Sequence, residues 1–335
     1  MRTQEKMLVI GACGWMGLEL VPALARKFGV QNVLATDIHP EYPEFSNYRY
    51  LDVFDIDQVE SVVRENAITQ IYLLAAMLAG KGELRGGETW RFNVKSLLST
   101  LEVANNNGVA KVFWPSSIAV FGPGSPKYNC PQQTRIETNS MYGISKRAGE
   151  YWCNNYFEQY GTDVRSLRLP ELISPTGQET TGTTNYPVDI FKGAVNDGVY
   201  NCYLSEDNCL PMMYMPDAVR AVIELMDAPK ESITIRTSYN IAAMSFSPCD
   251  LAAEIRKHIP GFSISYEPDF RNVVAYSLPA SIKDLQARAD WGWQSAFNLE
   301  KTTIDMLSKL HATPGKESGT VQSKDQQYEY GMLPG

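Results

Sequence analysis

A tyrosine and a lysine one helical turn apart, Tyr142 and Lys146, are the residues whose types and spacing best suit a proton transfer. They lie in "SMYGISKRAGEYW", where a helix-forming run puts both side chains on one face. A free tyrosine titrates at about pH 10, roughly three units too high for a base at neutral pH, and a fixed cation beside the phenol can supply part of that shift. Because this spacing also occurs often by chance, a surface pair is the alternative interpretation.

Two serines, Ser116 and Ser117, end a predicted strand about 25 residues earlier, in "VFWPSSIAVFG". Ligands of open α/β sheets collect at the carboxyl ends of the strands, and a hydroxyl there can hold a substrate oxygen. The coincidence of tyrosine, lysine and strand-end serine favours a proton-transfer site over a surface pair.

Short apolar runs alternate with amphipathic stretches through the first half of the chain, which predicts parallel strands connected by helices. The expected strands are "MLVIG", "NVLATD", "QIYLLAA", "AKVFWPSS" and "DVRSLRLP", and the expected helices lie near residues 15–28, 57–66, 88–107 and 141–160. The predicted fold class is therefore α/β, a doubly wound parallel sheet of the Rossmann type with a smaller C-terminal substrate lobe.

Three parts of the chain are expected to differ in role. Residues 1–174 form the nucleotide-binding Rossmann domain, whose sheet can recruit later segments. Residues 175–311 form mainly a substrate-binding lobe, because the pattern changes there to a Gly/Thr-rich loop and mixed short elements. Residues 312–335 show little periodicity and are predicted to be a mobile tail.

A glycine-rich turn, "VIGACGWMG", separates the first predicted strand from the first helix. Gly11, Gly14 and Gly17 allow the backbone to approach a pyrophosphate at the helix N-terminus, and Trp15 and Met16 belong to the same predicted cofactor site. A tight turn without a ligand is the alternative.

Asp37 ends the next predicted strand, about 20 residues beyond the last glycine. A carboxylate there can accept hydrogen bonds from both ribose hydroxyls and repels a 2'-phosphate, and the neighbouring "IHPEYP" offers no Arg or Lys to attract one. The cofactor is therefore predicted to be NAD rather than NADP, and its nicotinamide charge would lower the pKa of Tyr142 further. A helix-capping role for Asp37 is the alternative.

Two further strand ends are expected to face the same cleft. The first carries Asp52 near the adenine, followed by Val53, and the second carries Leu74, Ala75 and Ala76, whose small side chains permit close approach of the cofactor. Ordinary core packing of the alanines and a solvated turn at Asp52 are the alternatives.

The bulk composition excludes several classes of protein. A net charge of -8 and a pI near 5.1 argue against binding to nucleic acid, and no apolar run is long enough for a membrane helix. The 6 cysteines and 3 histidines are scattered without metal-ligand spacing or a disulfide framework, so neither a metal nor an oxidising compartment is expected. The apolar strand begins too early for a signal peptide, which predicts a cytoplasmic protein; a mitochondrial matrix location would require a missing presequence.

At these residues the chain resembles the extended short-chain dehydrogenase/reductase family, which has GxxGxxG, a following Asp, a strand-end Ser and YxxxK. The resemblance implies that Tyr142 is the general acid/base and that Lys146 is its electrostatic partner and a ribose contact. The family's spacing selects Ser117 as the hydroxyl that orients the reacting oxygen, with Ser116 as the alternative. Asn93, in "RFNVKS", matches a family asparagine near the cofactor, and its alternative is a buried polar packing residue.

Strings in the second half, "GTTNYPVDIF", "LPMMYMPDAV", "SYNIAAMSFSP" and "ARADWGW", are similar to those of the metal-free L-threonine 3-dehydrogenases, and the resemblance covers residues 6–311. It implies NAD-dependent oxidation of L-threonine to 2-amino-3-ketobutyrate, with Thr184 touching the substrate from a closing loop; capping of the next helix by Thr184 is the alternative. A homodimer is also implied, with the helices at 88–107 and 141–160 forming a four-helix interface.

Three positions depart from that resemblance. Ala79 stands at a substrate position where a serine is usual, Glu171 replaces a glycine, and Asn185 replaces an aspartate, which puts substrate affinity in doubt. A nucleotide-sugar epimerase or dehydratase with a larger pocket is the second hypothesis. A catalytically silent NAD-binding regulator is the third.

Overall fold

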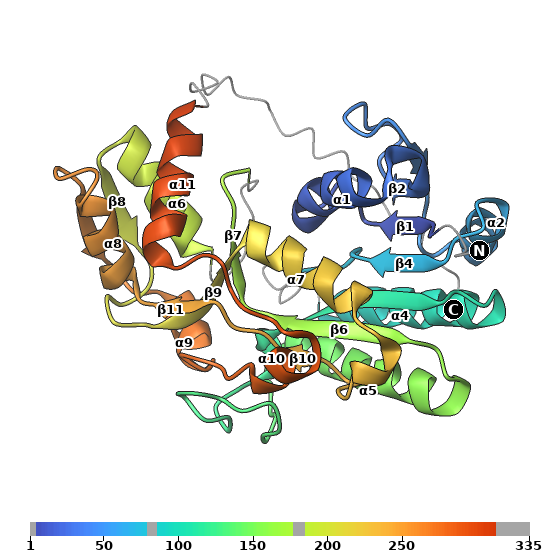
Figure 1. Cartoon of the computed structure of the whole chain (residues 1–335). Helices are drawn as coiled ribbons and strands as arrows, with labels where there is room; N and C mark the ends of the chain where they lie inside the picture. Colours follow the sequence, from blue (N-terminus) through green and yellow to red (C-terminus); the bar gives the residue numbers. More distant parts are fainter. Residues whose placement is uncertain (1–4, 79–85, 177–184, 313–335) are drawn as a thin grey trace.

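The computed structural model describes residues 5–78, 86–176 and 185–312, and its centre is a parallel sheet flanked by helices (Figure 1). The strand order is β10-β6-β5-β4-β1-β2-β3, and each neighbouring pair is parallel. The strands are β1 (Met7–Ile10), β2 (Val33–Asp37), β3 (Tyr48–Tyr50), β4 (Gln70–Leu73), β5 (Lys111–Ser117), β6 (Val164–Leu169) and β10 (Tyr239–Asn240). The predicted doubly wound α/β sheet is confirmed.

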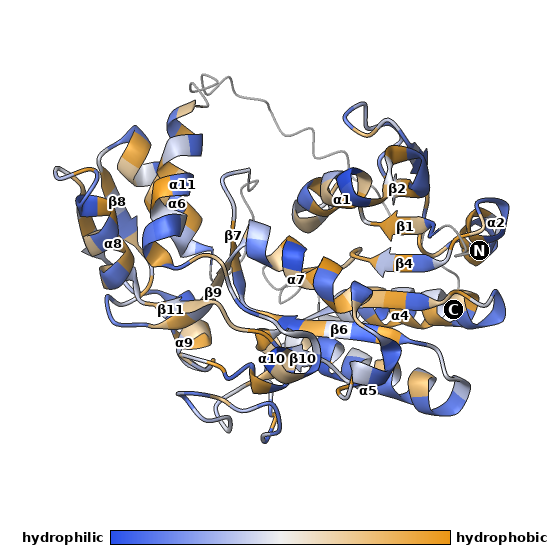
Figure 2. Ribbon diagram, in the orientation of Figure 1, coloured by the Kyte–Doolittle hydropathy of each residue, from blue (hydrophilic) through white to orange (hydrophobic). Residues whose placement is uncertain are grey.

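Helices cover both faces of the sheet because successive side chains along each strand point to opposite sides. Met7 and Val9 of β1 join the apolar layer under one pair of helices. Leu8 and Ile10 join the layer under the other helices, and Figure 2 shows β1 in the orange of hydrophobic residues. The first layer contains α1 (Trp15–Phe28) and α7 (Met215–Asp227), and the second contains α2 (Ile56–Glu65), α4 (Gly86–Asn106) and α5 (Met141–Tyr160).

A second lobe, at the left of Figure 1, is entered where the chain leaves β6 for β7. Two small sheets, β11-β9-β7 and β12-β8, and their helices enclose a separate apolar core. Its elements are β7 (Glu171–Ile173), β8 (Val199–Cys202), β9 (Leu210–Tyr214), β11 (Met244–Phe246), β12 (Ser263–Tyr266), α6 (Tyr186–Asn196), α8 (Pro248–Arg256), α9 (Phe270–Tyr276) and α11 (Leu299–Ala312).

Segments after residue 174 contribute to both parts of the molecule. β10 pairs with β6 at the edge of the large sheet, and α7 packs beside α1. Four short helices complete the described chain: η1 (Val30–Asn32), η2 (Ile118–Val120), η3 (Lys230–Ser232) and α10 (Leu285–Trp291). The predicted tail lies outside the described residues except for Ala312, which still belongs to α11.

Candidate active site

The glycine-rich turn lies at the carboxyl end of β1, where added side chains would collide with neighbouring backbone. Gly11 has φ +89°, and a Cβ there would lie 2.5 Å from the backbone nitrogen of Ala75. A Cβ on Gly17 would lie 2.3 Å from the carbonyl oxygen of Ala12, so this glycine lets α1 approach β1 closely. The glycines therefore leave a cradle, the space over the turn between β1 and α1 that no side chain fills.

The first turn of α1 carries neither a side-chain cap nor an acidic residue. Gly14 is its N-cap, and the helix begins at Trp15 and Met16, whose side chains pack against the apolar cores. These two residues contribute their backbone N–H groups to the turn. The groups lie at the positive end of the helix dipole, which suits binding of a pyrophosphate.

Asp37, at the end of β2, connects this turn to the sheet through a hydrogen bond. Its Oδ2 accepts a hydrogen bond from the backbone N–H of Cys13 at 2.9 Å, and its Oδ1 accepts one from Ile38 at 2.8 Å. Each carboxylate oxygen retains lone pairs for a second donor, so both ribose hydroxyls could bind here. Asp37 thus lies beside the turn, where the sequence placed it.

The next two strand ends extend the same edge. Asp52 accepts a hydrogen bond from the backbone of Phe54 at 2.9 Å, and Val53 is buried. The N–H groups of Leu74 and Ala75 both donate to the carbonyl of Ile10, at 2.8 and 3.0 Å. Leu74, Ala75 and Ala76 are partly exposed, so the end of β4 is accessible rather than packed in the core.

Asn93 of α4 connects the loop after β4 to α5. Its Oδ1 accepts from the backbone of Met77 at 2.9 Å, and its Nδ2 donates to the carbonyl of Met77 at 3.1 Å and to the hydroxyl of Ser145 at 3.0 Å. Both amide hydrogens are therefore used within the protein, and the side chain is buried. Asn93 thus acts here as a structural tie, which is the alternative that the sequence left open.

Tyr142 and Lys146 lie one turn apart at the start of α5, whose N-cap, Ser140, accepts a hydrogen bond from Gly143. The Lys146 ammonium lies 5.5 Å from the centroid of the Tyr142 ring and 4.6 Å from that of Trp114. It donates to the carbonyl of Pro115 at 2.7 Å. Burial lowers the pKa of Lys146 to about 7. The geometry is that of a cation held beside a phenol.

The two strand-end serines have different surroundings. Ser117 hydrogen-bonds to Tyr142, which lowers the pKa of the phenol, and also accepts from the N–H of Ala119 at 3.1 Å. Ser116 is buried and donates to Glu150 Oε1 at 2.8 Å. Only Ser117 therefore shares a hydrogen bond with the tyrosine.

Burial has the largest effect on Tyr142 and raises the pKa of its phenol. The second cause is the negative charge of Glu171, a residue that the sequence analysis noted as a departure without giving it a role. The electrostatic surroundings of the phenol therefore include a carboxylate as well as the lysine.

A buried ion-pair network behind Ser116 was missed by the sequence analysis. Arg168 of β6 donates to both oxygens of Glu150, at 2.7 and 2.9 Å, and also binds Asn240 of β10 at 3.0 Å. Arg147 adds a bond to Glu150 at 2.8 Å. Two signals were available: an arginine inside an apolar strand, and a glutamate two turns beyond Tyr142 on the same helix face.

Two predicted substrate positions, Ala79 and Thr184, lie outside the described residues, as does most of the proposed closing loop. Asn185 is the buried N-cap residue of α6. Within the described chain no group of three or more His, Cys, Asp or Glu side chains could hold a metal ion. No helix in the same residues is long and apolar enough to cross a membrane.

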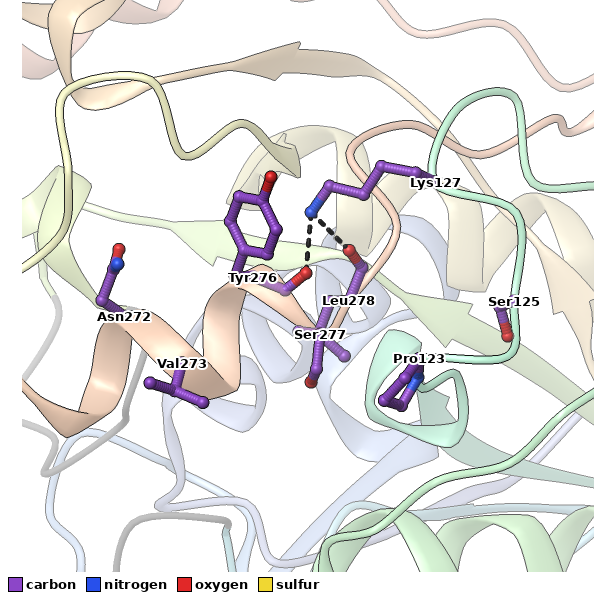
Figure 3. A pocket seen from close by; sticks show the side chains of 8 residues that line it. All are labelled: Pro123, Ser125, Lys127, Asn272, Val273, Tyr276, Ser277 and Leu278. Atoms are coloured by element: carbon purple, nitrogen blue, oxygen red, sulfur yellow. Dashed lines mark hydrogen bonds between the residues drawn. The ribbon is translucent and has the colours of Figure 1, made fainter.

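A pocket of about 640 Å³ lies elsewhere, between the loop after η2 and α9 (Figure 3). Lys127 donates there to the carbonyls of Tyr276 and Leu278, both at 2.9 Å. None of the residues that line this pocket belongs to the predicted site. Its position gives no support for a role in the chemistry.

The parallel sheet, its glycine-rich first turn and the tyrosine, lysine and serine at one strand edge are the arrangement of a Rossmann-type oxidoreductase. The chain belongs to the NAD dependent epimerase/dehydratase family, whose model matches residues 7–242. Its cofactor is NAD, and the side-chain-free cradle, the uncapped start of α1 and the carboxylate of Asp37 fit that molecule.

Similar proteins include named threonine dehydrogenases. The mitochondrial L-threonine 3-dehydrogenase of Bos taurus is 38% identical over 324 residues, which cover 96% of this chain and 85% of that protein. The holo form of a GalE-like L-threonine dehydrogenase from Cupriavidus necator is 49% identical with a TM-score of 0.89, and the match covers 91% of this chain and 99% of that one. A monomeric L-threonine 3-dehydrogenase from a metagenome is 40% identical with a TM-score of 0.87, over 91% and 99% of the two chains.

Proposed function

We propose that this chain is an L-threonine 3-dehydrogenase, which oxidises the hydroxyl-bearing carbon of L-threonine and forms 2-amino-3-ketobutyrate, a step in threonine catabolism. The observation that carries the proposal is the 49% identity to a threonine dehydrogenase over 91% of this chain, which includes the second lobe as well as the sheet. A sugar epimerase of the same family would share the sheet but would need a second lobe shaped for a larger substrate.

Tyr142 is the base for the hydroxyl proton in this proposal. Ser117 supports the assignment because its hydroxyl binds the phenol and can hold the same substrate oxygen. As the carbonyl forms, the proton passes to Tyr142 and the two electrons of the C–H bond leave as hydride. NAD, when bound, supplies the acceptor for that hydride.

Lys146 favours the ionised phenol through its charge. Its ammonium is 5.5 Å from the tyrosine ring and is held by the carbonyl of Pro115. With a pKa of about 7, this lysine is partly protonated at neutral pH, and a hydrogen bond to a ribose hydroxyl would favour the charged form. Lys146 would thereby couple cofactor binding to activation of Tyr142.

A homodimer in the cytoplasm is part of the same proposal. Apolar side chains exposed along α4 and α5 are consistent with a helical interface: Trp90, Ile144, Tyr151, Trp152 and Tyr160. The Bos taurus relative is named mitochondrial and the metagenome relative monomeric, so both features need direct tests. Light scattering at micromolar concentration gives the mass, and a monomer would contradict the interface.

The decisive experiment is NADH production at 340 nm with L-threonine, L-serine and UDP-sugars offered side by side. Turnover that is largest with L-threonine supports the proposal. Conversion of a UDP-sugar with no turnover of threonine would establish the epimerase or dehydratase alternative. Binding of NAD with no turnover of any substrate would identify a silent NAD-binding protein.

A further inference from the structure

Three successive residues at the end of β5 each bind a different turn of α5. The carbonyl of Pro115 accepts from Lys146 at 2.7 Å, the hydroxyl of Ser116 donates to Glu150 at 2.8 Å, and Ser117 hydrogen-bonds to Tyr142. The three α5 residues are four positions apart along the chain, which places them along one face of the helix. The bond between the tyrosine and the serine is therefore one of three that join this helix to the strand end.

Glu150 is fully buried and is bound from two further sides. Arg168 of β6, which lies opposite Ser116 in the pairing of β5 with β6, donates to both oxygens of the carboxylate, at 2.7 and 2.9 Å. Arg147 of α5 donates to Oε2 at 2.8 Å. Because Arg168 supplies two of these bonds, loss of the Ser116 hydroxyl alone leaves the carboxylate attached to the sheet.

Arg168 is itself held in place by its buried neighbours. Its Nη1 donates to the carbonyl of Gln132 at 3.2 Å and to the side-chain oxygen of Asn240 at 3.0 Å. Asn240 belongs to β10, and its backbone N–H donates to the side chain of Gln132 at 2.7 Å. Glu150 is thus bound to a fixed cation, and α5 cannot move along the sheet without breaking charge-assisted hydrogen bonds, which are among the strong ones in proteins.

Two glycines let α5 lie close to the strand and to the turn that follows it. A Cβ on Gly149 would lie 2.3 Å from the ring of Trp114 in β5, and a Cβ on Gly143 would lie 2.1 Å from the carbonyl oxygen of Ala119 in η2. This packing excludes movement of the helix toward the sheet, so its position along its own axis depends on polar bonds such as those of Glu150. That position matters because a displacement of about 1 Å between reacting groups can cost about 10²-fold in rate.

We propose that Glu150 is a positioning residue, which holds α5 at the point along β5 where the Tyr142 phenol and the Ser117 hydroxyl meet. This inference rests on the proposed threonine dehydrogenase activity, in which both groups contact the reacting oxygen. Glu150 lies two turns from Tyr142, about 12 Å along the helix axis, and acts through this geometry rather than on the substrate. Its loss should therefore lower kcat and change the KM for NAD little, because the cofactor cradle belongs to β1 and α1.

The test separates positioning from stability by removing one charge of the buried pair or both. Glu150→Gln leaves Arg168 buried without its counter-charge, and it should lower the melting temperature by about 5–15 °C and kcat for L-threonine by about 10- to 100-fold. Glu150→Gln combined with Arg168→Met removes both charges and retains a side-chain oxygen for Ser116, so the melting temperature should return to within about 3 °C of the wild type. The kcat of this double variant should stay low, because the bonds that anchor α5 to β6 are gone.

Asp163→Asn is the matched control. Asp163 is also a buried carboxylate with two arginine partners, Arg165 at 2.7 Å and Arg236 at 2.5 Å. It precedes β6, at the end of that strand away from Ser117. The variant should lose a similar amount of stability and keep a kcat and an NAD affinity close to those of the wild type. All rates are measured at a temperature at which circular dichroism shows every variant to be folded.

The outcomes separate this inference from the proposed function. A kcat that stays low in the double variant, with a kcat near that of the wild type in Asp163→Asn, supports the positioning role. Recovery of kcat together with the melting temperature in the double variant would refute that role and leave the proposed function intact. Equal losses of kcat in Glu150→Gln and Asp163→Asn would refute it too, since a general loss of stability would then explain both. Absence of threonine oxidation in the wild type would refute the function, and this inference with it.

Discussion

Ser116 and Ser117 are adjacent at the end of β5, yet Ser116 donates to the buried carboxylate of Glu150 whereas Ser117 binds the phenol of Tyr142. Successive side chains of a strand point to opposite faces, so one hydroxyl belongs to the scaffold and the other to the proposed active site. The register of the strand, rather than the residue type, decides which serine can do chemistry.

Substitution of each serine by alanine should separate these two roles. Ser117→Ala is expected to lower kcat/KM for L-threonine by about 10²- to 10³-fold, because a donor to the reacting oxygen is lost. Ser116→Ala is expected to lower the free energy of unfolding by about 1–3 kcal/mol, because the buried Glu150 loses a hydrogen bond, with kinetics close to the wild type. Steady-state assays and urea unfolding of both variants check the pair. Equal kinetic losses would mean that the assignment of Ser117 is wrong.

Tyr142→Phe should bind NAD nearly as well as the wild type and turn over about 10² to 10⁴ times more slowly, the usual loss for a general acid/base. The ring remains, so its contact with the Lys146 ammonium and the packing of α5 remain too. Titration with NAD and initial rates with L-threonine measure the two effects separately. Wild-type turnover in this variant would remove Tyr142 from the mechanism.

The sheet was predictable from the sequence because its strands are continuous apolar runs between amphipathic helices. The predicted helix at 141–160 matches α5, and that at 15–28 matches α1. A strand end at Asp52 was predicted and β3 ends close to it, at Tyr50, whereas β10 was not predicted, since an element of 2 residues shows no usable periodicity. β10 also lies about 70 residues after β6, with which it pairs, and a pairing between such distant segments leaves no local pattern in the sequence.

The site residues were predictable where their role follows from spacing along the chain. They were unpredictable where their role depends on which distant side chains they contact in the fold. Tyr142 and Lys146 follow from the helical repeat, and the glycines from the turn. The sequence could not show that the Asn93 side-chain amide donates hydrogen bonds to Met77 and Ser145. These bonds connect α4 to α5 and to the loop after β4, which are far apart in the sequence. For the same reason the effect of the Glu171 charge on the pKa of Tyr142 became visible only in the folded chain.

Gly11→Ala tests the cradle at the first turn. The positive φ of Gly11 and the 2.5 Å approach to Ala75 mean that a methyl group must displace backbone. Strain of this kind costs about 1–3 kcal/mol, so lower stability and at least a 10-fold weaker affinity for NAD are expected. Gly261→Ala is the control, because nothing lies within 4 Å of the Cβ it would gain. Unfolding curves and NAD titrations that are alike for both variants would contradict the role of Gly11.

Asp37→Ala should relax the preference for NAD over NADP. The carboxylate is placed to bind the ribose hydroxyls and to repel a 2'-phosphate, and its loss also frees the N–H of Cys13 that it now binds. The quantity to compare is the ratio of kcat/KM with NAD to that with NADP. Asp52→Ala, at the neighbouring strand end, should leave the ratio unchanged. A ratio in the Asp37 variant equal to that of the wild type would show that another residue reads the ribose.

Lys146→Met should flatten the pH dependence of stability in the NAD-free protein. Lysine has a pKa of 10.5 when unperturbed and about 7 when buried at this position. Between these values the unfolded state binds more protons than the native state, so the free energy of unfolding of the wild type rises with pH, by at most about 1.4 kcal/mol per unit from this group. Methionine has a similar shape and no proton to lose, so the variant lacks this pH-dependent contribution. Relative to the wild type, its free energy of unfolding is therefore most favourable at the low-pH end of this interval.

Urea unfolding at several pH values between about 7 and 10 measures the effect, and the difference between wild type and variant should change by at least about 2 kcal/mol over that range. Lys283→Met, at an exposed position, serves as the control and should run parallel to the wild type. Should the Lys146→Met curve also run parallel, the lysine keeps an ordinary pKa in the folded chain. Its ammonium would then be fully charged at neutral pH. The hydrogen bond to the Pro115 carbonyl and the cation–π contact with Trp114 would then have to offset the free-energy cost of burying that charge.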